Sequence, residues 1–255
     1  MANIQCEHED DCLRIRLSSG TANTLTTAVI QDLAHAVEDA NRETRGAMLC
    51  GGEKFFCNGL DLDWALACSR AGISEMFHAL AGLILAMLES PLPIVGAIRG
   101  HAIGGGMAIY LACDYRYAAA GRVLIGKPEI LLGVPNPYYG DQLLRFVAGD
   151  FVASDLIYTG KLVRAEEGRA LGLVHETGSK EDIERMAWER LLFLRDLAPE
   201  AFVESKRMRL GKFCADLREQ MPVRIARQVE IWSSDEAQAR LRAGAERLKR
   251  RRSED

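Results

Sequence analysis

The stretch GAIRGHAIGGGMAIYLACDYRYA, residues Gly96–Ala118, decides the fold class of this chain. Its apolar start continues the run from Ile94 and predicts a buried strand, which a second short strand follows at once. Three consecutive glycines, Gly104–Gly106, then form a turn into an apolar helix that starts near Met107. This order of strand, turn and helix is typical of one unit of an α/β fold.

The segments before this stretch repeat the alternation of strands and helices. Cys12–Leu17 alternates apolar and polar residues, as a half-buried strand does, and Ala47–Cys50 is a short buried strand between glycines. Apolar residues recur every four positions from Leu25 to Glu38, and Ile73–Leu88 has the same helical spacing before Pro91 and Pro93 end it. Several crossover units are therefore expected, which again indicates an α/β fold.

The second half of the chain becomes helical. Val123–Gly126 and Leu171–His175 are predicted strands, with a helix at Tyr139–Phe146 between them. From Lys180 onward the pattern predicts helices at 181–197, 199–208 and 219–248. We expect an α/β core over residues 1–195 and a helical region over 196–255 that serves packing or oligomerisation.

The composition is that of a globular protein. The 255 residues are 48% hydrophobic and 27% charged, which excludes disordered and collagen-like chains. A formal net charge of -4 gives no global attraction for nucleic acid. The basic run Lys249–Arg252 is interpreted as the cationic end of a helix, with nucleic-acid binding as the alternative.

The cysteines and the N-terminal segment predict a cytoplasmic protein. The 7 cysteines are scattered without any pair at CxxC spacing, which favours reduced core residues. The segment MANIQCEHEDD lacks the basic and apolar blocks of a signal peptide. The longest apolar run, Ala79–Met87, is too short to cross a bilayer, so we expect no membrane association.

Two loops have the composition of a site for a developing negative charge. Gly104–Gly106 lets a ligand approach the backbone where a helix starts, although close packing of strand and helix would explain the same glycines. In FFCNGLDL, Phe55–Leu62, Asn58 and Gly59 tolerate left-handed backbone angles that can turn the next amide inward. Two convergent backbone N–H groups would form an oxyanion hole.

Five ordered segments carry a resemblance to a known family. They are NTLTTAVIQDLAHAV (Asn23–Val37), GGEKFFCNGLDL (Gly51–Leu62), the stretch Gly96–Ala118, KPEILLGV (Lys127–Val134) and AEEGRALGLV (Ala165–Val174). Together they resemble the crotonase, or enoyl-CoA hydratase/isomerase, superfamily, and the resemblance spans most of the chain.

The resemblance implies a fold, an assembly and a substrate class. The fold is a spiral of repeated ββα units followed by a helical region, residues 196–255, that mediates trimerisation and closes the CoA pocket, so a homotrimer or hexamer is expected. The substrate is an acyl-CoA thioester whose oxygen meets the amides of Leu60 and Gly105. Coenzyme A is then part of the substrate, and neither a cofactor nor a metal is expected. Asp61 matches a position that ties the loop backbone rather than acting as a base.

The glutamate positions of the family indicate which reaction to expect. Family hydratases use two glutamates, and here the first position is Ala108, which cannot transfer a proton, whereas the second is Glu129. One carboxylate suffices to shift a double bond, so the resemblance favours a Δ3-Δ2-enoyl-CoA isomerase with Glu129 as the shuttle. Pro137, Tyr138 and Tyr139 are similar to a stretch of family isomerases and are interpreted as pocket residues that exclude water, with core packing as the alternative.

Other roles stay open at this point. Asp141 is a candidate pocket carboxylate that would suit a hydratase, decarboxylase or hydrolase, or else the first-turn acid of a helix. Lys54 and Lys206 are candidate contacts for the CoA phosphates, and His101 is interpreted as structural. The alternative of another class is a protein that binds acyl-CoA without catalysis.

Overall fold

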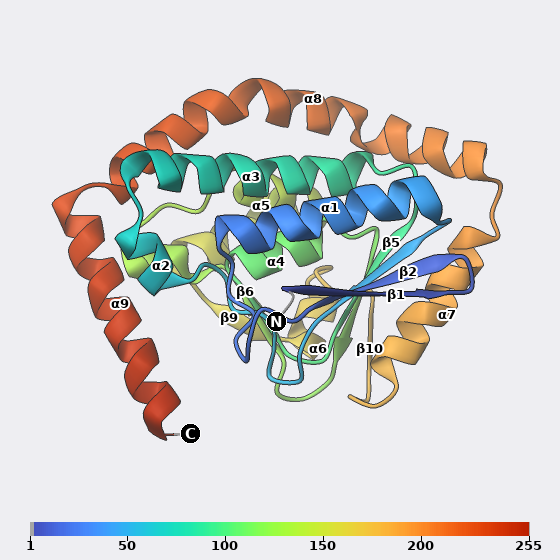
Figure 1. The fold of residues 1–255 in the computed structure, drawn as a ribbon, viewed down its shortest axis with the longest axis horizontal. Coiled ribbons are helices and arrows are strands. Elements are labelled where there is room, and N and C mark those ends of the chain that lie inside the picture. The colour runs from blue at the N-terminus through green and yellow to red at the C-terminus, as the bar shows by residue number, and fades with distance from the viewer. Residues whose placement is uncertain (1–2, 255) are drawn as a thin grey trace.

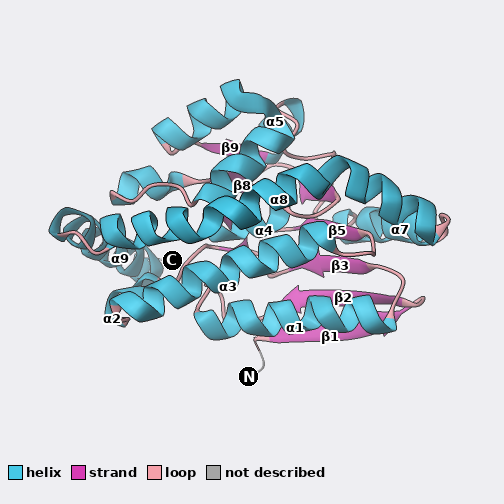
Figure 2. Cartoon of the chain, turned by 90° about the horizontal axis from the view of Figure 1, so that it is seen from above, coloured by secondary structure: helices cyan, strands magenta, loops and turns pink. Residues whose placement is uncertain are grey.

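The computed structural model describes residues 3–254, with side chains described for residues 3–250. Two sheets form the centre of the molecule (Figures 1 and 2). The strands are β1 (Ile4–Glu9), β2 (Cys12–Leu17), β3 (Ala47–Cys50), β4 (Phe55–Cys57), β5 (Ile94–Ile98), β6 (His101–Ile103), β7 (Tyr115–Ala119), β8 (Leu124–Gly126), β9 (Leu162–Arg164) and β10 (Glu176–Gly178). The larger sheet has the order β1-β2-β3-β5-β7-β10 and the smaller one β4-β6-β8-β9.

Most strand pairs are parallel, as expected when helices connect them. Only β1 with β2 and β8 with β9 are antiparallel among the pairs of described strands. β3 and β5 are buried along their whole length, because helices cover both faces of a parallel sheet. At the start of the stretch Gly96–Ala118, β5 belongs to the larger sheet and β6 to the smaller. The chain therefore crosses between the two sheets just before the glycine turn.

The helices form layers around these sheets. They are α1 (Thr27–Glu43), α2 (Leu62–Ala67), α3 (Arg70–Glu89), α4 (Gly105–Leu111), α5 (Tyr138–Thr159), α6 (Ala165–Ala170), α7 (Ile183–Arg195), α8 (Pro199–Trp232) and α9 (Asp235–Glu254), with a short 3-10 helix, η1 (Pro128–Leu132). α7 packs against β3, β5, β7 and β10, and α1 packs against β1 and β2. α8 lies over α3 as the outermost layer (Figure 1).

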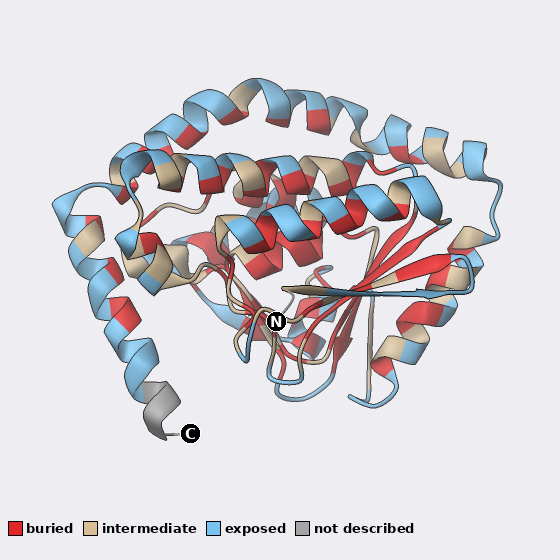
Figure 3. Ribbon diagram, in the orientation of Figure 1, coloured by how far each residue is buried: buried red, intermediate tan, exposed pale blue. Residues whose placement is uncertain are grey.

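Among the described helices, α3 alone is long and apolar enough to cross a membrane by length and composition. It is longer than the run Ala79–Met87 that the sequence analysis considered. Its apolar side chains are used inside the protein, since Phe77, Leu80 and Ile84 are buried and the helix packs between α1 and α8 (Figure 3). These contacts are those of a core helix.

Two sequence predictions are corrected by the fold. Leu171–His175 is not a strand: the Leu173 amide donates to Gly168 O, so this segment closes the end of α6 with Leu173 and Val174 buried, and the strand begins at Glu176. The separate helices predicted at 199–208 and 219–248 are wrong in their boundaries. α8 is continuous from Pro199 to Trp232, and the interruption lies at Ser233–Ser234, where the Ser234 hydroxyl accepts a hydrogen bond from Ala237 N of α9.

Candidate active site

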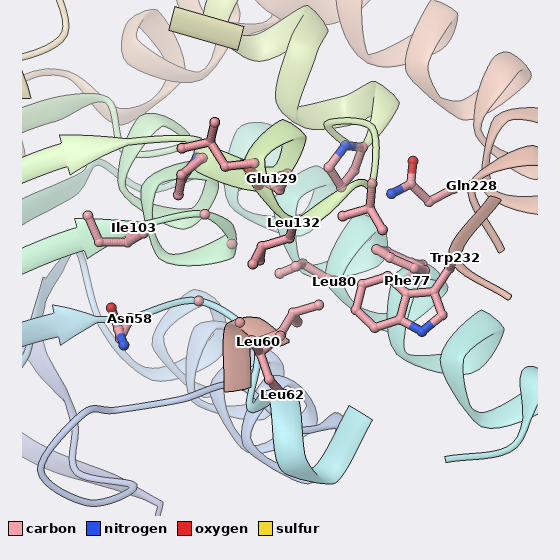
Figure 4. A pocket seen from close by; sticks show the side chains of 18 of the residues that line it. Asn58, Leu60, Leu62, Phe77, Leu80, Ile103, Glu129, Leu132, Gln228 and Trp232 are labelled. Atoms are coloured by element: carbon pink, nitrogen blue, oxygen red, sulfur yellow. The ribbon is translucent and has the colours of Figure 1, made fainter. Parts of the chain in front are cut away.

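A cavity of about 320 Å³ lies where β4, β6 and β8 end, and α3, α8 and α9 close its sides. Its lining is mostly apolar. Figure 4 shows Glu129 on one side and Phe77 with Trp232 on another, and Leu80 and Leu132 lie between them. The rings of Phe77 and Trp232 meet edge to face, with their centroids 5.8 Å apart. Such a cavity suits an apolar chain with a polar group at one end.

The loop after β4 contributes the first amide of the predicted oxyanion hole. Gly59 has a φ of 77°, a backbone conformation that glycine adopts without strain. The Leu25 amide donates to Gly59 O, and the Asp61 amide donates to Leu25 O, so Leu60 is paired with Leu25 as a parallel bridge. Because these two bonds use the groups on either side of Leu60, its own N–H faces away from Leu25, and Leu60 lines the cavity.

The Asp61 side chain holds this loop in place. Its Oδ1 accepts a hydrogen bond from Trp64 N as the N-cap of α2, and its Oδ2 accepts one from the Thr24 hydroxyl. The structural role expected for Asp61 is confirmed by these contacts.

The glycine turn contributes the second amide. Gly104 has φ 57° and ψ -119°, which a residue with a side chain adopts only under strain, and α4 begins at the next residue. A Cβ atom placed on Gly59 would lie 3.6 Å from Gly105 N. The two loops are thus in contact, and both Leu60 and Gly105 line the cavity, as the sequence predicted.

Glu129 lies beside the glycine turn. It belongs to the first turn of η1, and a Cβ atom placed on Gly104 would lie 3.6 Å from Glu129 Oε1. Its Oε1 pairs with Lys127 Nζ at 3.0 Å. Its Oε2 is buried and has no hydrogen-bond partner among the described residues. The sequence prediction that Glu129 and the two amides share one site agrees with this geometry.

Lys127 is a residue of the site that the sequence analysis missed. Its side chain is 1% exposed, and its ammonium donates to Gly104 O at 3.1 Å in addition to pairing with Glu129. A lysine after an apolar strand is ordinarily solvated. The available signal was its place between Gly126 and Pro128, where the chain leaves a buried strand.

Of the three residues predicted to exclude water from the pocket, Pro137, Tyr138 and Tyr139, the structure places two in the cavity lining and one outside it. Pro137 and Tyr139 line the cavity, and burial together with the negative charge of Glu129 raises the pKa of Tyr139. Tyr138 is not part of the lining, because its ring packs against the Arg224 guanidinium, 5.3 Å away.

Glu129 is the only carboxylate among the described residues that line the cavity. Asp141 lies in the first turn of α5, where it pairs with Arg145 at 3.0 Å and accepts a hydrogen bond from Gln142. It is therefore not brought into the cavity, which corrects its prediction as a pocket carboxylate. Ala108 is fully buried in α4 and also lies outside the lining.

Neither lysine predicted to contact CoA lines the cavity. Lys206 is buried, and its ammonium donates to Asp114 and to the carbonyls of Met87 and Leu92, so its charge is used to fasten α8 to α3 and β7. The binding role assigned to Lys206 is corrected on this ground. Lys54 lies before β4, where its carbonyl accepts a hydrogen bond from His101 N.

His101 has the structural role expected of it. Its Nδ1 accepts a hydrogen bond from Leu124 N, which joins β6 to β8. Burial, and secondly the positive charge of Lys54, lowers the pKa of His101.

The last helix, which lies in the region expected to close the CoA pocket, forms one wall of the cavity. Gly244, Arg247 and Leu248 of α9 line the cavity, and Lys249 pairs with Asp63 of α2 at 2.7 Å. The first residue of the basic run is thus engaged within the chain, whereas the side chains of Arg251 and Arg252 lie outside the described residues. Arg247 therefore provides a positive charge in the cavity lining, where neither Lys54 nor Lys206 lies.

Comparison with known proteins identifies the family. The sequence profile described as enoyl-CoA hydratase/isomerase matches residues 7–254. A putative enoyl-CoA hydratase/isomerase of Bacillus subtilis is 31% identical over 188 residues, which are 72% of this chain and 72% of that protein.

Solved structures give the same result. The human mitochondrial Δ3-Δ2-enoyl-CoA isomerase superposes with a TM-score of 0.94 at 25% identity, over 98% of this chain and 99% of that one. An enoyl-CoA hydratase from Bacillus halodurans superposes with a TM-score of 0.88, also at 25% identity, over 95% of this chain and 100% of that one. The chain therefore belongs to the enoyl-CoA hydratase/isomerase family, the crotonase superfamily, and is close in structure to its enoyl-CoA isomerases.

Proposed function

We propose that this protein is a Δ3-Δ2-enoyl-CoA isomerase in which Glu129 carries one proton from the α carbon to the γ carbon of the acyl chain. The observation that supports this most directly is that Glu129 is the single carboxylate among the described residues that line the cavity. Hydration of a double bond needs water to be activated and a carbon to be protonated, whereas a double-bond shift needs one base that later returns its proton.

The reaction divides into two proton transfers. Glu129 Oε2, which has no other described partner, takes a proton from the carbon next to the thioester. The electron pair moves onto the thioester oxygen, and the amides of Leu60 and Gly105 hold the resulting enolate oxygen. The same carboxyl group then protonates the γ carbon, and the double bond becomes conjugated with the thioester. No other reactant is consumed.

The apolar lining supports isomerisation over hydration. Pro137 and Tyr139 stand in the cavity wall with Leu132 and Trp232, and these side chains leave little polar surface on which a reacting water could be held. The human isomerase that superposes at 0.94 is consistent with this proposal.

The first experiment mixes the purified protein with 3-hexenoyl-CoA and follows the ultraviolet band of the conjugated thioester. We expect the band to grow with the native protein and Glu129→Gln to lower kcat by about 10³-fold, within the range for loss of a general base. The matched control is Asp141→Asn, which removes a carboxylate outside the cavity and should retain activity.

Other outcomes would assign another function. Loss of the band of 2-hexenoyl-CoA would indicate hydration, and release of free CoA would indicate hydrolysis. Binding of the thioester with neither change would indicate a protein that binds acyl-CoA without catalysis.

A further inference from the structure

We infer that Lys127 is a positioning residue that fixes both the peptide of the oxyanion hole and the carboxylate of Glu129. This inference rests on the proposed function, because it assigns Lys127 a part in the same enolate chemistry. Its ammonium lies 3.1 Å from Gly104 O and 3.0 Å from Glu129 Oε1. One buried cation therefore contacts the carboxylate and the peptide group that carries one of the two oxyanion amides.

The burial of Lys127 indicates that its contacts with Gly104 and Glu129 have a role beyond packing. A buried ammonium is costly unless charged or polar partners surround it. Lys127 is 1% exposed and Glu129 has a side chain that is 16% exposed, so the pair is shielded from water and its interaction is little screened. An apolar side chain could fill the same space at lower cost if packing were the only requirement.

The contact with Gly104 acts on the oxyanion amide directly. Gly104 C=O and Gly105 N–H belong to one planar peptide group, so a bond that fixes the carbonyl also fixes the direction of the N–H. A cation at the carbonyl oxygen polarises this peptide and makes its N–H a stronger donor. The Gly104 amide on the other side donates to Gly126 O at 2.8 Å. The turn is thus held from both sides, and Gly105 lines the cavity.

The contact with Glu129 distinguishes its two oxygens. Lys127 holds Oε1, whereas Oε2 is buried and has no hydrogen-bond partner among the described residues. We assign the proton transfer to this unpartnered oxygen. The fixed geometry matters because the same oxygen must reach two carbons of the acyl chain in turn.

The first helix turn of α5 leaves room for the ammonium. A Cβ atom placed on Gly140 would lie 2.9 Å from Lys127 Cε and 3.0 Å from Nζ. Gly140→Ala therefore crowds the ammonium without altering its charge, and it also crowds Asn136 Oδ1, 2.9 Å from the added Cβ atom. Because Gly140 is a helical residue, alanine is compatible with its backbone.

The test compares Lys127→Met, Gly140→Ala and Lys206→Met with the native protein. Lys206→Met is the matched control, because it also breaks a buried lysine–carboxylate pair but lies outside the cavity. Two readouts are used: kcat and KM for 3-hexenoyl-CoA, and the enolate absorbance of bound 3-oxohexanoyl-CoA. The second readout reports charge held at the oxyanion amides and needs no turnover.

We expect Lys127→Met to lower kcat by about 100-fold with KM within threefold, and to lose the enolate band. Gly140→Ala should give the same split between kcat and KM at a smaller magnitude. Lys206→Met should lower thermal stability and retain kcat and the enolate band. If Lys127→Met does not fold, the decision rests on Gly140→Ala.

The inference is overturned if the folded Lys127 variant, or Gly140→Ala in its place, retains both kcat and the enolate band within threefold of the native values. A native protein that shows no isomerisation but forms the enolate band, with the band lost in Lys127→Met, would overturn the proposed function and leave the role of Lys127 standing. A native protein with neither activity nor band would overturn both.

Discussion

Asp61 is the residue at which the structure distinguishes most sharply between support and catalysis. It follows Leu60 directly, and a carboxylate so close to an oxyanion amide could be mistaken for a base. Both of its oxygens are occupied, one by Trp64 N and the other by the Thr24 hydroxyl. Asp61 also lies outside the lining of the cavity that contains Glu129. Its contacts stabilise the start of α2 and, with it, the direction of the Leu60 amide.

Replacing Asp61 by asparagine and by alanine separates these roles. Asparagine caps helices as well as aspartate does, so Asp61→Asn should retain kcat within threefold and keep the native stability. Asp61→Ala removes the cap and should lower the free energy of unfolding by about 1 kcal/mol. Urea unfolding and the isomerase assay measure the two effects. A loss of kcat in Asp61→Asn comparable to that of Glu129→Gln would instead make the carboxylate part of the chemistry.

At this scale the sequence could identify residues whose role depends on the backbone or on a local motif. Gly105 and Glu129 are found in this way, because a glycine turn and a PE dipeptide are visible in the chain. Lys127 was missed, since its position in the chain is only a weak signal and its burial depends on Gly104, 23 positions earlier, and on Gly140 in a later helix. Lys206 was misassigned for the same reason: its partner Asp114 lies 92 positions away.

The elements were predictable where hydrophobic periodicity is strong. α1 and α3 have regular apolar faces, and both were predicted with the correct type and approximate position. The start of α8 at Pro199 was predicted, but its continuity and its end were not, because its middle is mostly polar and exposed and contains Pro222, so no continuous apolar face marks it as one helix. The proposed division of the chain at residues 195 and 196 stays a prediction, and α8 begins close to it, at Pro199.

The C-terminal helical region was expected to close the CoA pocket, but the α9 side chains that line the cavity were beyond sequence reasoning. One of them leads to a prediction about substrate binding. Arg247→Ala removes an exposed cation that lines the cavity next to Leu248. If Arg247 contacts a phosphate of CoA, we expect KM for 3-hexenoyl-CoA to rise about tenfold with kcat unchanged, as for loss of a charge-assisted hydrogen bond. Steady-state kinetics at low and moderate salt measure this.

Arg242→Ala is the matched control, because Arg242 is an exposed arginine of the same helix outside the cavity lining. It should leave KM within twofold of the native value. An equal rise of KM in both variants would show that general positive charge on α9, rather than contact by Arg247, attracts the substrate.

The whole molecule is organised around one continuous core that joins both sheets and most of the helices. Five of the seven cysteines belong to it: Cys12, Cys50, Cys57, Cys113 and Cys214 are buried, whereas Cys68 is partly exposed and Cys6 is exposed. All seven are free thiols, in agreement with their interpretation as reduced residues. Burial raises the pKa of Cys50, Cys57 and Cys113 to about 12.

Alkylation of the native protein should therefore be confined to two thiols. The thiolate is the reactive form, and at pH 8 a thiol with a pKa of about 12 is ionised to about one part in 10⁴. We expect iodoacetamide to modify Cys6 and Cys68 in the folded protein, and all seven thiols in denaturant, as counted by mass spectrometry of the intact chain. Raising the pH should speed both native reactions, since the pKa of each of these thiols is also raised, mainly by burial.

Cys57 is the buried thiol whose modification would report on the site, because it ends β4 immediately before the loop that carries Leu60. Rapid native modification of Cys57 would contradict the rigid packing of that loop, and protection of Cys57 by a bound CoA thioester would then show that the oxyanion site closes only when substrate binds.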